Sequence, residues 1–417
     1  MIDVGILRDR PQVLAAALSR RGVALDVGAL AEIDAARRTA RADAEGMRSQ
    51  QKDVGKSIAN LSGDEKAAAI AEAGELSDRY KARVAEADDL DARFLEQWVT
   101  VPNLADETAA DGFEEEDSIE ITRWGEPREF DFDVKDHVDL GAALGIIDIE
   151  RATKISGSRF GMIKGKLALL EMAVVRWSMD VLSAYGFTPV VPPVLVREQA
   201  LFGTGFFPAE RDQVYSVQED DLYLVGTSEV PLAAMHADEI FAADELPLRY
   251  AGFSTCFRVE AGTYGKDTRG LFRVHQFDKV EMFSFVNADR SREEHEFLLA
   301  REEELVQALE IPYRVVNVAA GDLGASAAKK YDIEAWFPGQ ERYREVTSTS
   351  NTTDYQSRRL KVRVKDVDDK NRLVHTLNGT AVTGRALIAL VENHQQADGS
   401  ITIPEALRPY TGFDVID

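Results

Sequence analysis

Charged and aromatic side chains alternate in the stretch from Cys256 to Phe285, which reads CFRVEAGTYGKDTRGLFRVHQFDKVEMFSF. Successive side chains of a strand point to opposite faces, so Arg258 and Glu260 share one face of the first strand-like segment. Arg273 and Phe277 share one face of the second. If the segments pair as a hairpin, this face suits a phosphorylated purine, because arginines bind phosphates and a ring stacks on the base. A solvated strand face with cross-strand ion pairs is the alternative.

Three further segments place polar side chains at the ends of predicted strands or helices. The sequence VGTSE, residues 225–229, lies between a short strand and a helix, where Thr227 or Ser228 would cap the helix. The glutamate that follows would be favoured by the helix dipole. Residues 342–359 form a polar strand and turn, and residues 377–410 a strand leading into a helix.

The composition is typical of a soluble globular protein with more than one domain. The chain has 417 residues, 45% hydrophobic and 29% charged. Its apolar runs, such as Ala386 to Val391, are far shorter than the ~20 residues that span a bilayer, and no apolar signal core begins the sequence. We therefore expect a cytoplasmic protein with no membrane contact. The single cysteine, Cys256, excludes an intramolecular disulfide and a multi-cysteine zinc site, so no zinc is expected.

The net charge of −24 argues against a nucleic-acid partner for the chain as a whole. Local charge matters more, however, and residues 35–56 hold six basic side chains against three acidic ones. The charge pattern of this segment suggests contact with the phosphates of a nucleic acid.

A heptad pattern predicts an antiparallel helical hairpin over about residues 27–99, with a polar turn at residues 62–65. The apolar residues of its first series recur every seven positions: Ile33, Ala40, Met47, Val54 and Leu61. Two helices of ~30 residues would be roughly 45–50 Å long. An ordinary coiled-coil hairpin that contacts another protein is the alternative. Pro102 ends the second helix, and we place a domain boundary near residue 105, before an acidic linker.

Residues 166–184 predict an amphipathic helix with a wide apolar stripe. The following strand-like run, residues 187–196, contains Pro189, Pro192 and Pro193, which predict the edge of a sheet. This edge would be covered either by its own domain or by a second copy of the chain.

Several common catalytic and nucleotide-binding motifs are absent from the sequence. No Walker loop, Gly-x-Gly-x-x-Gly fingerprint, His-Glu-x-x-His pair or nucleophile elbow occurs. A chain that handles ATP without a glycine-rich loop needs another phosphate clamp. Paired arginines with a carboxylate-held magnesium ion would supply one.

The run TRGLFRVHQFDKVEMF, residues 268–283, resembles motif 2 of the class II aminoacyl-tRNA synthetases, and the seryl-tRNA synthetases in particular. Residues 166–196 resemble motif 1, the dimer interface of that class, and residues 377–410 resemble motif 3. The resemblance covers nearly the whole chain. It implies an α+β fold with an antiparallel sheet flanked by helices, a tRNA-binding domain over residues 1–105 that carries the hairpin, and a catalytic domain over residues 106–417.

The resemblance also implies roles for individual residues in a reaction between L-serine and ATP. Arg258 would bridge the α-phosphate and the serine carboxylate, with Glu260 near the adenine and Phe277 stacked on it. Arg273 and Arg385 would hold the outer phosphates. The implied catalytic residues are Arg258, Glu260 and Arg385.

The ATP site implied by the resemblance comprises Arg258, Val259, Glu260, Arg273, Val274, Phe277, Glu345, Val346, Thr347, Ser348 and Arg385. Glu345 and Ser348 would also hold Mg²⁺ with the nucleotide. The implied serine pocket comprises Thr227, Ser228, Glu229, Arg258, Glu281 and Thr380. The motif 3 segment is one residue shorter than the family pattern, which leaves open whether Thr380 or Thr383 faces the serine hydroxyl.

In this family the helical hairpin contacts the serine tRNA, so the implied partners are tRNA(Ser) and tRNA(Sec), together with a second copy of the chain. The candidate phosphate contacts are Arg37, Arg41, Arg48, Lys52 and Lys56. Two alternatives stay open: a related ligase that loads an amino acid onto a carrier protein, and a non-catalytic paralogue. The hairpin argues against the first, and the presence of Arg258, Glu345 and Arg385 argues against the second.

Overall fold

The computed structural model describes residues 1–217, 219–261, 269–366 and 368–417. Residues 262–268, which belong to the loop of the predicted hairpin, lie outside these ranges. The chain divides into two compact units. One is Asp3–Val101, and the other is Pro102–Asp417 together with Met1–Ile2.

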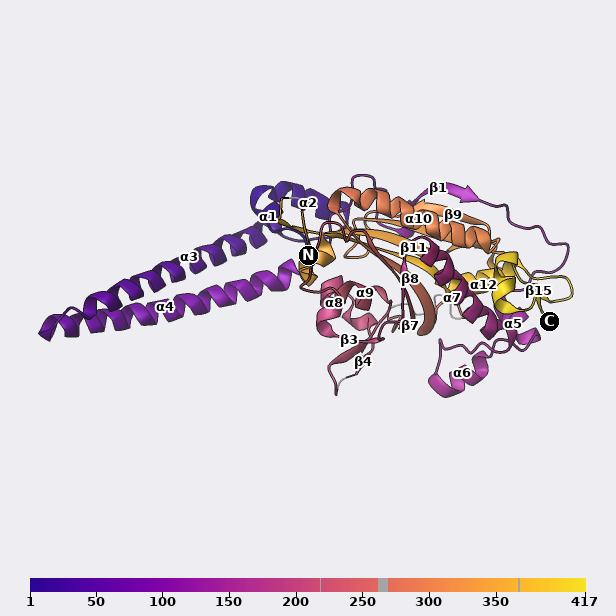
Figure 1. The fold of residues 1–417 in the computed structure, drawn as a ribbon, viewed down its shortest axis with the longest axis horizontal. Helices are drawn as coiled ribbons and strands as arrows, with labels where there is room; N and C mark the ends of the chain where they lie inside the picture. Colours follow the sequence, from indigo (N-terminus) through magenta and orange to yellow (C-terminus); the bar gives the residue numbers. More distant parts are fainter. Residues whose placement is uncertain (218, 262–268, 367) are drawn as a thin grey trace. The chain divides into compact units, whose positions relative to one another are not determined.

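The first unit is helical. Two short helices, α1 (Gly5–Asp9) and α2 (Pro11–Arg20), precede the long helices α3 (Val27–Ile58) and α4 (Gly63–Trp98), which lie side by side (Figure 1). Asp26 caps α3 by accepting a hydrogen bond from the Ala29 backbone amide at 2.9 Å. The predicted hairpin is therefore present, although its turn ends earlier than expected because Gly63 already begins α4.

An eight-stranded sheet organises the second unit, in the order β1-β9-β10-β11-β14-β8-β7-β2. Its neighbours pair antiparallel except β2, which pairs parallel with β7 at one edge. The strands are β1 (Ile119–Trp124), β2 (Thr188–Val190), β7 (Leu248–Phe257), β8 (Gln276–Val286), β9 (Tyr313–Asn317), β10 (Lys329–Phe337), β11 (Arg342–Thr353) and β14 (His375–Thr383). The predicted α+β fold is confirmed, and Pro189 does lie in an edge strand.

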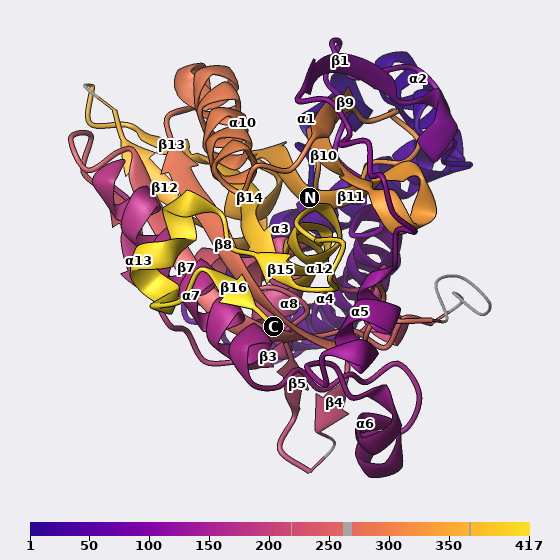
Figure 2. The same ribbon diagram turned by 90° about the vertical axis from the view of Figure 1, so that its right-hand side faces the viewer.

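Three helices pack against this sheet: α7 (Lys166–Ala184), α10 (Ser291–Ala308) and α12 (Gly384–Asn393) (Figure 2). Their apolar side chains and those of the sheet form one core, in which Leu170, Leu298 and Leu390 are fully buried. No helix within the described ranges is long and apolar enough to span a bilayer.

Shorter elements surround the sheet. The helices are α5 (His137–Ala143), α6 (Ile149–Ser156), α8 (Glu198–Thr204), α9 (Glu229–Ala234), α11 (Tyr355–Leu360) and α13 (Arg408–Thr411), with the 3₁₀ turns η1 (Glu115–Asp117), η2 (Arg211–Gln213), η3 (Ala288–Arg290), η4 (Pro338–Gln340) and η5 (Glu405–Leu407). The small sheets contain β3 (Leu195–Arg197), β4 (Ser216–Val217), β5 (Leu222–Leu224), β6 (Ile240–Phe241), β12 (Arg363–Lys365), β13 (Asn371–Leu373), β15 (Ile401–Thr402) and β16 (Val415–Ile416).

Candidate active site

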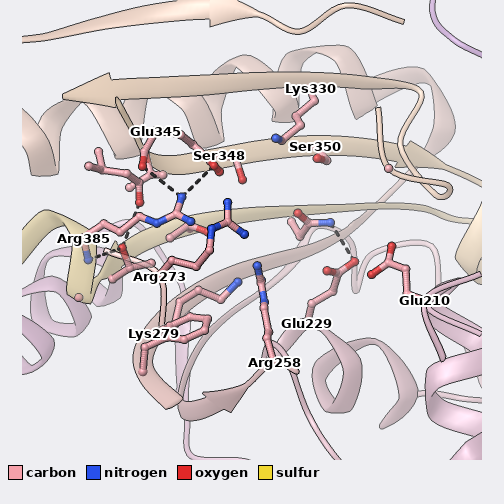
Figure 3. A pocket seen from close by; sticks show the side chains of 18 of the residues that line it. Glu210, Glu229, Arg258, Arg273, Lys279, Lys330, Glu345, Ser348, Ser350 and Arg385 are labelled. Carbon is pink, nitrogen blue, oxygen red and sulfur yellow. Dashed lines mark hydrogen bonds and ion pairs between the residues drawn. The ribbon is translucent and has the colours of Figure 1, made fainter. Parts of the chain in front are cut away.

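A cavity of about 390 Å³ opens over the strands β8, β11 and β14 (Figure 3). It is lined by residues of these strands, the first residues of α12 and the segments 205–210, 271–274 and 324–327. Most of the residues proposed from the sequence meet here. Those on the wall are Glu229, Arg258, Glu260, Arg273, Val274, Phe277, Glu345, Val346, Thr347, Ser348, Thr380 and Arg385.

Arg258 faces the cavity from just beyond the end of β7. Strands β7 and β8 pair antiparallel up to Phe257, and the Arg258 amide then donates to the His275 carbonyl at 2.9 Å, so the pairing continues past the strand end. The Arg258 side chain donates to the Gly226 carbonyl at 3.3 Å, and its guanidinium lies 5.3 Å from the centre of the Phe277 ring. The predicted hairpin thus brings a cation and an aromatic ring to one wall, in a cation–π arrangement.

The strand interpretation needs one correction. Glu260 was expected within the first strand, but β7 ends at Phe257 and Glu260 has a left-handed backbone with φ of 53°. Arg273 likewise precedes β8. Glu260 and Arg273 nevertheless meet on the cavity wall, where the guanidinium of Arg273 donates to the Glu260 carboxylate at 2.5 Å.

Arg385 is held at the start of α12 by contacts from two other segments. Its guanidinium lies 2.9 Å from Glu345 Oε2, bonds the Glu345 carbonyl at 3.2 Å and stacks 4.6 Å from the Phe272 ring centre. Lys330 of β10 also lines the cavity and forms an ion pair with Asp332 at 2.8 Å. Burial alone would raise the pKa of Glu345, but Lys330 and Arg385 lower it to about 2. Glu345 is therefore ionised at neutral pH.

The residues around Glu345 fit a magnesium ion that arrives with a nucleotide. Such an ion takes one or two protein carboxylates and completes its shell with phosphates and water. Within the described ranges no three Asp, Glu, His or Cys side chains are grouped as a metal site. A magnesium ion that is bound to a nucleotide needs only one or two ligands from the protein. The ionised Glu345 carboxylate and the Ser348 hydroxyl, which lie on the same wall, can supply them.

Glu229 marks the other end of the cavity. Its Oε1 accepts hydrogen bonds from Gln356 Nε2 at 2.7 Å and Asn378 Nδ2 at 2.9 Å. Burial, together with the nearby Glu281 carboxylate, raises the pKa of Glu229 to about 7. The carboxylates of Glu229 and Glu210 lie at this end of the cavity, whereas Arg273 and Arg385 lie at the opposite end (Figure 3).

Four of the residues proposed from the sequence do not form the wall. Thr227, Ser228 and Glu281 are almost completely buried, and the Val259 amide bonds the Gln213 carbonyl at 2.9 Å. The Thr227 hydroxyl accepts from the Glu229 amide at 3.1 Å, whereas Ser228, the N-cap residue of α9, makes no side-chain capping bond. Glu281 forms an ion pair with Lys279, and Lys279 lines the cavity. In this structure these four residues are therefore not part of the lining of the cavity.

The geometry separates the two threonines that the shortened motif left open. The Thr383 hydroxyl accepts from the Arg385 amide at 3.2 Å and donates to the Val346 carbonyl at 3.1 Å, so it caps α12. Thr380 lies directly opposite Glu281 in the β14–β8 pairing. Both threonines line the cavity, but Thr380 is the one next to the carboxylate end.

Sequence reasoning did not propose several residues of the wall, including Glu210, Lys279, Lys330, Ser350 and Asn378. Lys279 shares the parity of Phe277 and could have been found from strand alternation. Glu210 and Lys330 come from segments with no recognisable pattern. Their place in the cavity depends on tertiary folding alone.

A buried acid lies beneath the wall on the helix side of the sheet. Glu302 of α10 is fully buried, and the Thr347 hydroxyl lies 3.5 Å from its Oε2. Burial, with the carboxylates of Glu281 and Asp332 nearby, raises the pKa of Glu302 well above the usual range.

In the helical unit, the basic residues proposed as phosphate contacts have different partners. Arg37 and Arg41 of α3 form ion pairs with Asp91 of α4, at 3.1 and 2.5 Å, and Arg41 also pairs with Asp88. Lys56 lies 3.4 Å from Asp53 on its own helix. Arg48 and Lys52 are exposed. They form no ion pair with any residue that the structure describes.

Comparison with known proteins places the chain in a class and then in a family. Residues 213–394 match the model of the tRNA synthetase class II core domain (G, H, P, S and T), so the chain contains the catalytic core of a class II aminoacyl-tRNA synthetase. Residues 1–105 match the seryl-tRNA synthetase N-terminal domain. The serine–tRNA ligase of Thermobifida fusca is 50% identical over 100% of this chain and 99% of its own length, and that of Acidothermus cellulolyticus is 51% identical with the same coverage.

Solved structures agree with these relatives. The seryl-tRNA synthetase of Pyrococcus horikoshii, complexed with ATP, superposes with a TM-score of 0.94 at 40% identity, over 100% of this chain and 99% of that one. The cytoplasmic serine–tRNA ligase of Naegleria fowleri, in complex with AMP, gives 0.88 at 30% identity over the same shares. The chain belongs to the seryl-tRNA synthetase family.

Proposed function

We propose that this protein activates L-serine with ATP and transfers the seryl group to tRNA(Ser) and tRNA(Sec). The observation that supports the proposal is that Arg258, Phe277, Glu345 and Arg385 line one cavity. In the first step an oxygen of the serine carboxylate attacks the α-phosphorus of ATP, and the bond to the β-phosphate breaks to release pyrophosphate. In the second, a hydroxyl of the terminal tRNA ribose attacks the seryl carbonyl and AMP leaves.

In this scheme the cationic end of the cavity binds the nucleotide. Arg258 neutralises the α-phosphate and the serine carboxylate, and Phe277 stacks on the adenine, with Glu260 and the Val274 backbone beside it. Arg273 and Arg385 hold the outer phosphates. Displacement at phosphorus depends chiefly on positioning and charge neutralisation, which arginines on a rigid sheet supply.

Magnesium would enter with ATP and neutralise phosphate charge. Glu345 and Ser348 would hold it, with Arg385 fixing the Glu345 carboxylate at 2.9 Å. The remaining members of the ATP site, Val259, Val346 and Thr347, would support the nucleotide through the backbone and the strand β11.

The carboxylate end would bind serine. Thr380 and the buried Glu281 would read the serine hydroxyl, while Thr227, Ser228 and Glu229 shape the pocket around it. A site built to bond a hydroxyl rejects a substrate that lacks it by roughly 10⁴–10⁵. Serine would therefore be distinguished from alanine by binding alone.

The helical unit would bind tRNA. We assign residues 1–105 to this role and residues 106–417 to catalysis. Arg48 and Lys52 are the most direct candidates for phosphate contact, because Arg37, Arg41 and Lys56 already have acidic partners. ATP and tRNA as substrates assign the protein to the cytoplasm.

A homodimer would form through residues 166–196. Large apolar side chains are exposed there, with Leu169 at 54%, Met172 at 68% and Val191 at 76% of their full exposure. Burial of this surface against a second copy would remove it from water. Sedimentation of the purified protein as a single chain would contradict this assignment.

Amino-acid-dependent pyrophosphate exchange with each of the twenty amino acids tests the activity. We expect serine alone to support exchange, because the pocket offers hydrogen-bonding groups for one small hydroxyl side chain. Exchange with another amino acid, and none with serine, would overturn the pocket assignment.

A further inference from the structure

A buried histidine connects helix α12 with the segment 271–274 of the cavity wall. His137, the first residue of α5, is 3% exposed. Its Nδ1 lies 2.7 Å from Oε1 of Glu392, a fully buried residue near the end of α12. On the other side of the ring, the Leu271 amide donates to His137 Nε2 at 3.0 Å. The imidazole therefore bridges α12 and the wall.

These contacts determine which ring nitrogen of His137 carries the proton. A backbone amide can only donate, so Nε2 must accept, and the proton of the neutral ring is on Nδ1. Nδ1 can then donate to the Glu392 carboxylate. The same carboxylate accepts from the backbone amides of His137 and Gly339, each at 3.1 Å. Three donors thus hold Glu392 in the position that selects this tautomer.

Neighbouring residues of the same segment also contact α5. A side-chain carbon added at Gly270 would lie 2.3 Å from His137 Nε2, and the φ of 90° at this position favours glycine. Arg269 forms ion pairs with Asp136, at 2.9 Å, and with Asp139. The Arg269 side chain is 61% exposed, and exposed ion pairs contribute little. The hydrogen bond to the buried imidazole is therefore the stronger restraint on this segment.

The residues that follow Leu271 belong to the part of the wall that would bind the outer phosphates. The Phe272 carbonyl accepts from Arg385 Nε at 3.3 Å, and the Phe272 ring centre lies 4.6 Å from that guanidinium. Arg273 comes next and donates to the Glu260 carboxylate. A shift of the Leu271 backbone would therefore displace Arg273 and the surface on which Arg385 packs.

We propose that His137 is a positioning residue for ATP, which acts through the Leu271 amide on Arg273 and Arg385. This inference rests on the proposed activation of serine with ATP. His137 is outside the lining of the cavity, so it would not touch the nucleotide itself. Loss of its Nε2 would leave the Leu271 amide without its acceptor, and an amide left unpaired is more costly than the average net gain from one hydrogen bond.

A second histidine of the chain provides a matched control. His236 Nδ1 lies 2.7 Å from Glu239 Oε2, and its Nε2 lies 2.9 Å from the Tyr250 hydroxyl. His236 thus also lies between a carboxylate and a second polar group, but neither it nor these partners line the cavity. A variant at this position removes a similar set of contacts without affecting the wall.

The test compares His137→Asn with His236→Asn in pyrophosphate exchange. The shorter side chain of asparagine can still reach Glu392 but not Leu271. We expect His137→Asn to raise the KM for ATP by about tenfold, because the Leu271 amide loses its acceptor. The KM for serine should not change, since serine would bind at the other end of the cavity. His236→Asn should match the parent protein in both.

A conservative variant separates the bond to Leu271 from the loss of the ring. The side-chain carbonyl of glutamine can take the place of Nε2 and accept from this amide, so His137→Gln should keep the KM for ATP within about threefold of the parent. An unchanged KM for ATP in His137→Asn would overturn the inference. So would equal rises in the KM for ATP and for serine, or the same rise in His236→Asn, because these would indicate a general loss of structure.

Two measurements decide the outcome if His137→Asn does not fold or if the proposed function fails. Nitrogen NMR of the parent protein, with signals assigned through His137→Gln, should show a protonated Nδ1 and an unprotonated Nε2 at His137. A proton on Nε2 would overturn the inference. Absence of serine-dependent exchange in the parent would refute the proposed function. Weaker ATP binding by His137→Asn than by the parent in calorimetry would still support the role of His137, and equal binding would overturn it.

Discussion

Arg41 in the helical unit and Arg258 in the cavity are the same type of residue in opposite circumstances. Arg41 pairs with two aspartates, Asp88 and Asp91, so its charge is already matched. Arg258 bonds a backbone carbonyl and lies over a ring, and it forms no ion pair within the described ranges. A cation in a cavity that forms no ion pair is available to bind a ligand. A cation on a helix that already forms ion pairs instead stabilises the contact between the two helices.

The largest expected effect concerns Arg258. Arg258→Ala should lower serine-dependent pyrophosphate exchange by about 10²–10³, because it removes preorganised charge from the phosphorus under attack. Arg41→Ala should leave exchange at the parent rate. Circular dichroism would show that both variants are folded. Equal pyrophosphate exchange by the two variants would show that Arg258 does not differ from Arg41 in its contribution to catalysis.

A smaller effect is expected from the exposed cations of α3 that lack acidic partners. The double variant Arg48→Glu, Lys52→Glu should raise the KM for tRNA by about tenfold or more, since phosphate contacts depend on basic side chains. Pyrophosphate exchange, which needs no tRNA, should not change. Normal aminoacylation by this variant would show that these two residues of α3 do not contact tRNA.

The two regions should also differ in their response to pH. Burial alone would raise the pKa of Asp91 in the helical unit, but hydrogen bonds and ion pairs with Arg41 and Arg37 outweigh this effect and lower it. Glu171 of α7 is half-buried beside Asp278, and burial followed by that neighbour raises its pKa to about 7. A raised carboxyl pKa means that the folded state binds more protons than the unfolded state above about pH 4.5. The free energy of unfolding should therefore fall as the pH rises from about 4.5 to 7.

Glu171→Gln removes this titration, because an amide cannot ionise. The free energy of unfolding of Glu171→Gln, relative to that of the parent, should increase by about 1–2 kcal/mol as the pH rises from about 4.5 to 7. Urea denaturation at several pH values measures the difference. Parallel pH profiles for variant and parent would show that Glu171 does not titrate as its surroundings indicate.

Part of the cavity could be predicted from local rules, whereas Glu345, Ser348 and Arg385 were proposed only from the resemblance to the synthetase family. Arg258 and Phe277 were found from strand alternation, and the helices α3, α4 and α7 from apolar periodicity. The pairing of Arg41 with Asp91 could not be predicted, since the register between two helices is set by packing along their whole length. Glu210 and Lys330 were missed for a similar reason: they reach the cavity from loops or strands that carry no motif.

The sequence also did not predict that Thr227, Ser228 and Glu281 are buried. Alternation predicts which face of a strand a residue is on, but it does not tell whether that face is the surface of a cavity or the layer beneath it. Glu281, for example, is almost completely buried and forms an ion pair with Lys279, which is two positions earlier on the same strand and lines the cavity.

The buried Glu302 of α10 limits which side chains position 379 can accept. A side-chain carbon added at Gly379 would lie 3.1 Å from Glu302 Oε1, and equally close to Met282 Cε and Thr349 Oγ1. A side chain at position 379 therefore requires all three neighbours to shift by a few tenths of an ångström. We expect glycine to persist at position 379 for as long as Glu302, Met282 and Thr349 surround it.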